Sequence, residues 1–285
     1  MYKLYTHSKY PYVQIVSIPF TSISKIDFAL CNQPTETPDK YYKRQAIKPN
    51  IITNGGFFNT SDGSTCFGFK NEGNTITRNY REGAAIIGNK KLELCSDQNK
   101  AGVRDFVEGY PVLIKEGRAL TINYATEINY NARRTCIGWN STHYFIVVVD
   151  KPGLKFKALQ EIFLELGATY AINLDGGGST RLLVEGKRKT AEVYARPVDN
   201  VMCVYLNKPE PIKVYYRVQV GAFSKKANAE KLREELVAKG FTEAYVKKVG
   251  VYYKVQLGAF SVKLNAERLM DRVTAAGYKA FITTK

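Results

Sequence analysis

The stretch Val214-Tyr-Tyr-Arg-Val-Gln-Val-Gly-Ala-Phe-Ser224 returns 37 residues later as Val251-Tyr-Tyr-Lys-Val-Gln-Leu-Gly-Ala-Phe-Ser261. After each copy, apolar residues recur at helical spacing, and a glycine ends the pattern. A short β-rich run, 244–249 or 279–283, closes each repeat. This order predicts a small βαββαβ domain at residues 214–285, with one sheet, two helices on one face and the other face open.

Residues 1–206 have a different pattern, and the Pro-containing stretch 207–213 reads as a linker between two domains. Short β-rich runs broken by Gly, Asn and Pro dominate this part. One helix is predicted at 157–166, between the apolar runs 144–149 and 169–174. The order strand, helix, strand predicts a crossover onto one buried sheet. The fold class is therefore α+β, with a mixed, β-rich N-terminal domain.

Charge and composition narrow the function classes. Lys and Arg outnumber Asp and Glu by 42 to 26, and residues 213–285 alone carry a charge of +9. Such dense charge favours nucleic acid, anionic lipid or an anionic cell wall as partner, and is equally typical of a lysine-coated soluble surface. No apolar run approaches the roughly 20 residues of a membrane span. Residues 1–10 lack the pattern of a secretory signal peptide.

The cysteines and histidines disfavour several kinds of catalytic centre. The five cysteines form no Cys-x-x-Cys pair, and the only histidines are His7 and His143. Zinc, thioredoxin-type and Ser-His-Asp chemistry are therefore not expected. Catalysis is expected to depend on carboxylates, arginines and amides. No metal or cofactor is predicted, although Asp175 with amide and backbone oxygens leaves a calcium site open.

The most unusual segment is Asn173-Leu-Asp-Gly-Gly-Gly-Ser-Thr180, directly after the second apolar run of the crossover. Three glycines permit positive φ and let backbone N–H groups converge on an anion. Asp175 lies at the mouth of this turn, and Ser179 and Thr180 add hydroxyl donors. Because tight turns need glycine in any case, the segment alone is compatible with a phosphate site without requiring one.

Three further segments carry candidate polar groups. Asn54-Gly-Gly-Phe-Phe-Asn59 places an amide and two glycines at the end of a strand, although Asn-Gly is also the strongest short signal of a type I′ hairpin. Arg133 and Arg134 precede another strand, and Arg196 precedes a proline. A planar, bidentate guanidinium suits phosphate oxygens, whereas exposed arginines are usually only solvated.

Taken together, these segments resemble the phosphodiester glycosidase family over roughly residues 50–206. The triple-glycine segment is the most specific part of the match. The matching segments, in the family's order, are Asn54-Gly-Gly-Phe-Phe58, Gly109-Tyr-Pro-Val-Leu113, Arg134-Thr135 with Gly138, Val149-Asp150, Leu166-Gly-Ala168, Asn173-Leu-Asp-Gly-Gly-Gly-Ser179 and Arg196-Pro-Val-Asp-Asn200.

The resemblance implies hydrolysis of a sugar-1-phosphodiester. Breaking the anomeric C–O bond builds positive charge on the sugar and negative charge on the phosphate, so anion stabilisation matters more than strong acid catalysis. Arg134 and Arg196 are expected to clamp the phosphate around one pocket shared with the glycine loop. Asp175 is expected to activate water or stabilise the cation, with Asp150 as the weaker second carboxylate. Substrate contacts are expected from Asn54, Gly55, Gly56, Glu108, Thr135, Gly176, Gly177, Gly178 and Ser179.

The repeated half closely resembles the SPOR (sporulation-related repeat) domain, which binds bacterial peptidoglycan and prefers glycan strands stripped of stem peptides. The Val-Gln-x-Gly-Ala-Phe-Ser core occurs in both copies. A βαββαβ sheet with aromatic residues also suits RNA, but the RNP1 pattern is missing, so nucleic acid is not an expected partner. The candidate glycan contacts are Gln219, Phe223, Ser224, Tyr253, Gln256 and Phe260.

The two halves predict a bacterial or phage cell-wall hydrolase with a catalytic domain at 1–206 and a SPOR domain at 214–285. The expected bond is of the N-acetylglucosamine-1-phosphate type, with the teichoic acid linkage as one candidate. Two alternatives stay open: a non-catalytic peptidoglycan-binding protein, because Ala132-Arg133 replaces the His-Pro that is frequent in the family, and a lysin that cleaves the glycan itself. Without a signal peptide, a phage lysin or a protein of a sporulating cell is expected, made in the cytoplasm and acting at the wall. The sequence does not indicate an oligomeric state.

Overall fold

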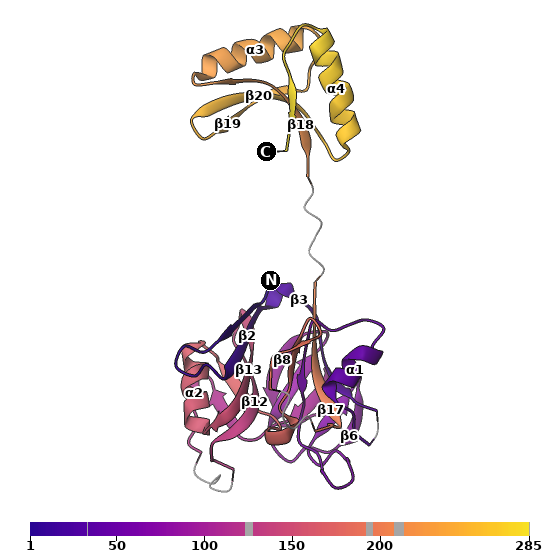
Figure 1. Ribbon diagram of the computed structural model, residues 1–285, viewed down its shortest axis with the longest axis vertical. Helices are drawn as coiled ribbons and strands as arrows, with labels where there is room; N and C mark the ends of the chain where they lie inside the picture. Colours follow the sequence, from indigo (N-terminus) through magenta and orange to yellow (C-terminus); the bar gives the residue numbers. More distant parts are fainter. Residues whose placement is uncertain (33, 123–127, 192–195, 208–213, 285) are drawn as a thin grey trace. The chain divides into compact units, whose positions relative to one another are not determined.

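Strand is the main element of the chain, because β-branched and aromatic residues fill its short apolar runs. The computed structural model describes residues 1–32, 34–122, 128–191, 196–207 and 214–284. It separates an N-terminal unit, Met1–Lys208, from a C-terminal unit, Pro209–Lys285 (Figure 1). Apart from Asn207, the linker predicted at 207–213 lies outside the described residues.

A seven-stranded antiparallel sheet carries the predicted crossover. Strands β13 and β14 both pair antiparallel with β12, so they run parallel to each other, and helix α2 (Phe156–Glu165) connects them. The helix begins one residue before its predicted start. In spatial order the strands are β1 (Lys3–Thr6), β2 (Val13–Pro19), β13 (His143–Leu154), β12 (Ala132–Trp139), β14 (Tyr170–Asn173), β10 (Val112–Lys115) and β11 (Arg118–Ala119).

Two five-stranded antiparallel sheets complete the N-terminal unit. One consists, in spatial order, of β16 (Lys187–Arg188), β15 (Leu182–Val184), β4 (Ile51–Asn54), β17 (Asn200–Leu206) and β3 (Ile23–Leu30). The other consists of β6 (Asn74–Thr77), β5 (Phe69–Asn71), β9 (Val103–Glu108), β7 (Gly83–Ile87) and β8 (Lys91–Cys95). The remaining helical segments are α1 (Pro38–Arg44), η1 (Phe20–Ser22) and η2 (Gly177–Ser179).

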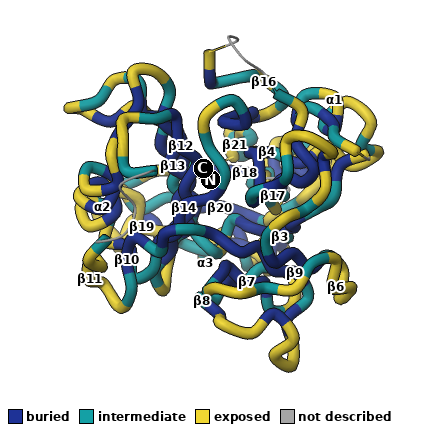
Figure 2. The backbone as a smooth tube through the Cα atoms, turned by 90° about the horizontal axis from the view of Figure 1, so that it is seen from below, coloured by how far each residue is buried: buried dark blue, intermediate teal, exposed yellow. Residues whose placement is uncertain are grey.

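Strand β13 is apolar on both faces because it lies between two hydrophobic clusters of this unit. A large cluster joins all three sheets, with Ile146 and Val148 contributed by β13. A second cluster fills the space between the seven-stranded sheet and α2, and β13 contributes Val147 and Val149 to it. A strand buried on both faces reads as a continuous apolar run, which is the pattern of 144–149. Figure 2 shows these central strands as buried and the outer loops as exposed.

The C-terminal unit is the predicted single sheet with both helices on one face (Figure 1). The helices are α3 (Lys226–Ala238) and α4 (Lys263–Ala275). A row of apolar residues crosses the sheet and packs beneath them: Ala244, Leu257, Val218 and Ile282. The strands, in spatial order, are β19 (Ala244–Val249), β20 (Tyr252–Phe260), β18 (Tyr216–Phe223) and β21 (Phe281–Thr283).

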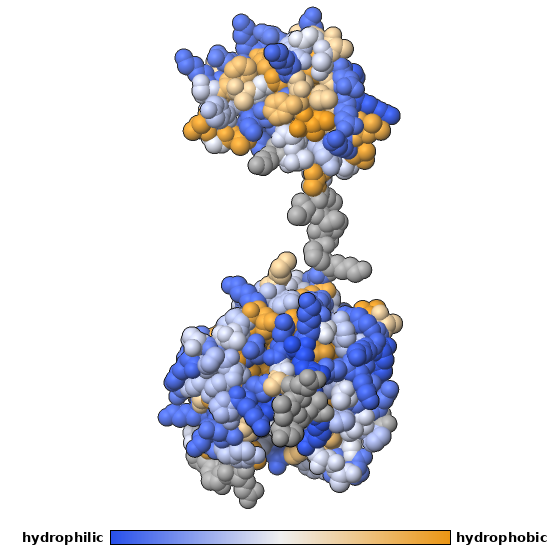
Figure 3. Space-filling model, viewed as in Figure 1, coloured by the Kyte–Doolittle hydropathy of each residue, from blue (hydrophilic) through white to orange (hydrophobic). Residues whose placement is uncertain are grey.

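Hydrophilic side chains cover most of each unit on the face shown in Figure 3. Among the described residues, no helix has the length and apolar character that crossing a membrane requires.

Candidate active site

The strands β4, β14 and β17 bring three of the predicted segments together at one end of the N-terminal unit. Asn54, fully buried at the end of β4, makes the central connection. Its Nδ2 donates to the Asp175 carbonyl at 2.8 Å, and its Oδ1 accepts from Thr135 Oγ1 at 2.6 Å and from the Arg181 N–H at 3.1 Å. The Asn54 and Thr135 side chains therefore position the backbone around Asp175. The structure directs them to the protein rather than to a sugar, which differs from the sequence prediction.

Close backbone packing explains several of the glycines. A Cβ on Gly55 would lie 1.9 Å from Asn200 Oδ1, one on Gly56 would lie 2.6 Å from Val107 Cγ2, and one on Gly176 would lie 2.5 Å from a backbone carbonyl oxygen. Their N–H groups also donate hydrogen bonds to other atoms of the protein. Gly56 donates to Asn200 Oδ1 at 2.7 Å, and Gly176 donates to Oδ1 of the preceding aspartate at 2.8 Å. The predicted contact between the Gly176 N–H and a phosphate is thus replaced by a contact within the loop.

Gly177 and Gly178 form the outer part of the glycine segment. Gly177 is exposed and has a φ of 58°, in the left-handed region that glycine adopts without strain. A Cβ on Gly178 would lie 3.6 Å from Arg196 Cβ. The glycine segment and Arg196 are therefore neighbours, as the sequence predicts.

Asp175, Ser179 and Arg196 form a hydrogen-bonded cluster at this point. Arg196 donates to Ser179 Oγ from Nη2 at 2.7 Å and from Nε at 3.2 Å, and its Nη2 lies 3.6 Å from Asp175 Oδ2. The Phe58 ring lies beneath the guanidinium, 5.4 Å away. Burial raises the pKa of Asp175, while hydrogen bonds from Ser179 and Gly176 and the charge of Arg196 oppose the rise. The Arg196 side chain is 38% exposed, so it presents positive charge to solvent beside a mostly buried carboxylate.

Asp199 belongs to the same region, although it is not among the residues predicted from the sequence. It is fully buried, its Oδ1 accepts from Asn200 Nδ2 at 2.5 Å, and its Oδ2 has no hydrogen-bond partner among the described residues. Burial is the largest cause that raises the pKa of Asp199 to about 7, and the charge of Asp175 adds to the rise. The signal for Asp199 was present, because it lies within Arg196-Pro-Val-Asp-Asn200.

An exposed thiol lies beside these carboxyls. Burial raises the pKa of Cys66, and the charges of Asp199, Asp175 and Glu108 raise it further. The other four cysteines are buried: Cys31, Cys95, Cys136 and Cys203. Cys66 is therefore a thiol at the edge of the candidate site that a reagent can modify.

The prediction for Arg134 is wrong in its geometry. Adjacent residues of a strand point to opposite faces of a sheet, and Thr135 points toward Asn54. Arg134 accordingly points toward α2, where its guanidinium stacks 4.3 Å from the Phe156 ring and donates to the carbonyls of Ile128 and Tyr130. The structure therefore does not bring Arg134 and Arg196 together around one pocket.

Asp150, the weaker carboxylate candidate, and Glu108, a predicted substrate contact, are both paired with arginines outside the Asp175 cluster. Asp150 Oδ1 lies 2.9 Å from Arg133 Nε. Glu108 is fully buried and accepts from the Gly68 and Tyr80 N–H groups at 3.0 and 2.9 Å, with Arg81 3.3 Å away. The Glu108 side chain therefore connects strands and loops of the five-stranded sheet that contains β9, rather than contacting a substrate.

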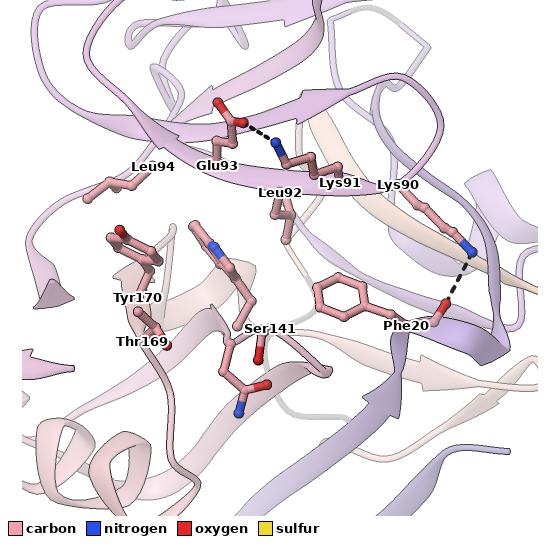
Figure 4. A pocket seen from close by; sticks show the side chains of 11 residues that line it. Phe20, Lys90, Lys91, Leu92, Glu93, Leu94, Ser141, Thr169 and Tyr170 are labelled. Atoms are coloured by element: carbon pink, nitrogen blue, oxygen red, sulfur yellow. Dashed lines mark hydrogen bonds and ion pairs between the residues drawn. The ribbon is translucent and has the colours of Figure 1, made fainter. Parts of the chain in front are cut away.

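A pocket of about 790 Å³ lies at the opposite ends of β12 and β14 (Figure 4). Trp139 and Tyr170 line it, and their rings lie 5.7 Å apart. Tyr170 begins β14 and Asp175 follows its end, so five residues of extended chain, about 16 Å, separate the two. None of the predicted site residues lines this pocket.

In the C-terminal unit, the predicted glycan contacts divide between the two faces of the sheet. Gln256 Nε2 donates to Gln219 Oε1 at 3.3 Å across β20 and β18. In the register, Tyr245 is opposite Gln256, and Phe281 is opposite Gln219. Because directly opposed residues share a face, these four side chains form a row on the face opposite the helices, called the open face here; within the row Gln219 and Gln256 are buried and Phe281 is exposed.

The other predicted contacts lie elsewhere. The ring of Phe223 lies 2.7 Å from where a Gly221 Cβ would stand, and Phe260 lies in the same way against Gly258; both pack with Tyr253 at the edge of the helix-facing core. A glycan contact of these two rings, as predicted, would therefore lie on the helix side of the sheet. Ser224 is exposed just after β18. Among the described residues of either unit, no group of three or more His, Cys, Asp or Glu side chains gathers as metal ligands would.

Comparisons with known proteins agree with this architecture. The sequence model of the phosphodiester glycosidase family matches residues 41–205, and that of the SPOR domain matches residues 213–284. No curated protein sequence matches the chain significantly. The peptidoglycan-binding domain of the B. subtilis cell wall lytic enzyme CwlC is 42% identical over 28% of this chain and 99% of that chain, with a TM-score of 0.25.

Two solved structures share the fold of the N-terminal unit. One is the catalytic domain of zebrafish N-acetylglucosamine-1-phosphodiester alpha-N-acetylglucosaminidase, which is 16% identical over 72% of this chain and 87% of that chain, with a TM-score of 0.54. The other is a hypothetical protein from Synechocystis, 14% identical over 72% of this chain and 61% of that chain, with a TM-score of 0.57. Since the family match alone covers more than half of the sequence, this chain belongs to the phosphodiester glycosidase family and carries a C-terminal SPOR domain.

Proposed function

We propose that the N-terminal unit hydrolyses a sugar-1-phosphodiester of the bacterial cell wall, of the N-acetylglucosamine-1-phosphate type. The observation that carries this proposal is the cluster of Asp175, Ser179 and Arg196, in which a carboxylate and a partly exposed guanidinium lie 3.6 Å apart at the glycine loop. A carboxylate suits the developing positive charge on a sugar, and a guanidinium suits phosphate oxygens.

In the proposed reaction, water attacks the anomeric carbon and the bond from that carbon to the phosphate oxygen breaks. The hydroxyl of water stays on the sugar, and the remaining proton passes first to Asp175 and from there to the released phosphate monoester or to solvent. Asp175 stabilises the cationic sugar and receives the proton of the attacking water. Arg196, held by Ser179, neutralises the second negative charge that the phosphate acquires on leaving.

Asp199 supports the same chemistry from behind this cluster. With a pKa of about 7, its carboxyl is partly protonated at neutral pH and titrates close to a phosphate monoester, whose second pKa is about 6. Because Asp199 is fully buried, we assign it a positioning and proton-holding role beside Asp175 rather than contact with the substrate.

The C-terminal unit is proposed to hold the enzyme on peptidoglycan glycan strands through the open face. Tethering raises the local concentration of wall-attached substrate, so modest affinity in the catalytic unit suffices. One bond that fits both units is the N-acetylglucosamine-1-phosphodiester that joins wall teichoic acid to muramic acid. The proposed place of action is therefore the cell wall, in the setting of phage lysis or sporulation.

The direct test is hydrolysis of a chromogenic N-acetylglucosamine-1-phosphodiester by the full chain and by Asp175→Asn. The wild type is expected to release a reducing sugar and a phosphate monoester, and Asp175→Asn to lose at least about a hundredfold in kcat while keeping its melting temperature. Asp62→Asn, at an exposed loop position, is the matched control. Full activity of Asp175→Asn would remove Asp175 from the reaction, and an inactive wild type that still binds walls would leave only the wall-binding function.

The teichoic acid assignment needs its own assay. Purified walls incubated with the full chain are expected to release polymer that ends in a reducing N-acetylglucosamine, and to keep muramic acid phosphate on the glycan. Loss of wall turbidity without such polymer would instead indicate cleavage of the glycan strand.

A further inference from the structure

A second, smaller pocket adjoins the glycine loop. Its volume is about 290 Å³, and side chains from β2, β12, β13 and the segment after β16, or directly beside them, line it: Tyr12, Gln14, Arg133, Asp150, Lys151 and Lys189. It opens at the end of the seven-stranded sheet where Asp175 lies. At this end, Val149 of β13 pairs with Val13 of β2 on one side and with Arg134 of β12 on the other. Its size lies near the lower end of the range typical of small-ligand sites.

The lining of this pocket is cationic. Among the residues that the structure describes, three cationic side chains line it, those of Arg133, Lys151 and Lys189, together with one carboxylate, that of Asp150. That carboxylate is already bound, because Oδ1 lies 2.9 Å from Arg133 Nε and Oδ2 accepts from the Ala191 N–H. Lys189 is half-buried, and no carboxylate of the described residues pairs with its ammonium group. A half-buried ammonium without a counter-charge favours an anion in its neighbourhood.

Arg133 connects the pocket wall to the catalytic loop. Its guanidinium pairs with Asp150 on one side and donates to the Thr180 carbonyl at 3.0 Å on the other. Its backbone carbonyl oxygen lies 2.5 Å from where a Gly176 Cβ would stand. The glycine segment from 176 to 180 is therefore packed directly on the residue that forms the inner wall of the pocket.

Chain length sets an upper limit on the distance to Arg196. The Ala191 N–H bonds to the pocket carboxylate, and Arg196 follows five residues later at the candidate active site. Five residues span at most about 18 Å when fully extended. A substrate with one phosphate at Arg196 can therefore reach the pocket with a second group that lies no more than about 18 Å away.

We propose that this pocket, between Arg133, Lys151 and Lys189, is a subsite for a second phosphate group of the substrate. The inference rests on the proposed function and deepens it. The preferred substrate carries another phosphate within about 18 Å of the scissile phosphodiester, as a chain of phosphodiesters does. A phosphate presents oxygens in several directions, which suits cations that come from β12, β13 and the segment after β16.

The test compares two esters of N-acetylglucosamine-1-phosphate, one with a neutral alkyl group and one whose alkyl group ends in a second phosphate. The wild type is expected to show about tenfold higher kcat/KM for the doubly charged ester, through KM. In Lys151→Gln/Lys189→Gln this ratio is expected to fall toward one. Lys187→Gln, on the exposed strand β16 two residues from Lys189, is the matched control and is expected to keep the wild-type ratio. An unchanged ratio in the double variant would overturn the subsite.

Binding separates this proposal from the proposed reaction. Calorimetry with Asp175→Asn measures the affinity for both esters without turnover. The second phosphate is expected to tighten binding about tenfold, and the two lysine substitutions to remove that gain. If neither ester is hydrolysed but the gain is present, the proposed function fails and the subsite stands. If both are hydrolysed and bound equally well, the subsite is wrong and the proposed function stands.

Discussion

Arg196 Nη2 lies 3.6 Å from Asp175 Oδ2, and Ser179 accepts two hydrogen bonds from the same guanidinium. This relationship distinguishes Arg196 from Arg134, whose guanidinium stacks on Phe156 and bonds to backbone carbonyls on the other side of β12. One arginine is thus placed to act on a substrate, and the other stabilises the fold.

Substitution of the two arginines tests this division. Arg196→Gln is expected to lower kcat/KM on a sugar-1-phosphodiester about 10²-fold or more, with little change in melting temperature, because a guanidinium aimed at the leaving phosphate is lost. Arg134→Met keeps much of the apolar stem against Phe156 but leaves two carbonyls without a donor. It is expected to cost about 1–3 kcal/mol of stability and to keep kcat in the folded fraction. The reverse pattern, measured by steady-state kinetics and urea unfolding, would restore the sequence prediction for Arg134.

The strand alternation explains why the sequence could not separate these residues. Arg133, Arg134 and Thr135 are consecutive, and their faces depend on a register shift between Ala132 and Arg134 that no periodicity reveals. The crossover helix and the C-terminal repeat were predictable, because their apolar residues recur at helical spacing and a glycine ends each helix. The close pairing of the Asn54 and Asp175 segments depends on long-range strand order, which local patterns do not contain.

The same reasoning applies to Asp199. Asp199 is a candidate because it is fully buried beside Asp175, and such burial at the end of a strand depends on tertiary packing that sequence patterns do not show. In the sequence, Asp199 is one acidic residue in a matching segment, whereas Asp175 is marked by three following glycines.

The raised pKa of Asp199 predicts a pH-dependent gain in stability for Asp199→Asn. The folded protein holds a proton on Asp199 up to about pH 7, whereas the unfolded chain releases it near pH 4, so this carboxyl lowers the stability of the fold progressively as the pH rises from about 4 to about 7. Asparagine removes this penalty. The free energy of unfolding is expected to rise by up to about 4 kcal/mol at pH 8, and the gain to disappear toward pH 4.

Urea unfolding at pH 4 and pH 8 measures this difference. Asp271→Asn, at an exposed position of α4, is the control for removing a negative charge from the surface. An equal effect of Asp199→Asn at both pH values would contradict the proposed titration of Asp199.

Thiol modification offers an independent test of where substrates bind. Cys66 is exposed and lies near Asp175 and Asp199, so a bulky maleimide on its sulfur is expected to abolish most of the hydrolytic activity by obstruction. Because the thiolate is the reactive form and the pKa of Cys66 is raised, labelling is expected to be slow at pH 7 and faster at pH 9. Cys66→Ser is expected to be active and insensitive to the reagent. Full activity of protein labelled at Cys66 would move the substrate site away from this loop.

The last prediction concerns the open face of the C-terminal sheet. Phe281 is 54% exposed at the end of the row with Gln219 and Gln256, whereas Phe223 packs against Gly221 on the helix side. If glycan strands bind to the open face, Phe281→Ala is expected to weaken cosedimentation of the full chain with stripped peptidoglycan about tenfold, with little change in stability. Phe223→Ala is expected to lower the melting temperature and to keep binding in the folded protein. Because the two residues lie on opposite faces of the same sheet, loss of binding in folded Phe223→Ala together with normal binding of Phe281→Ala would place the glycan on the helix side.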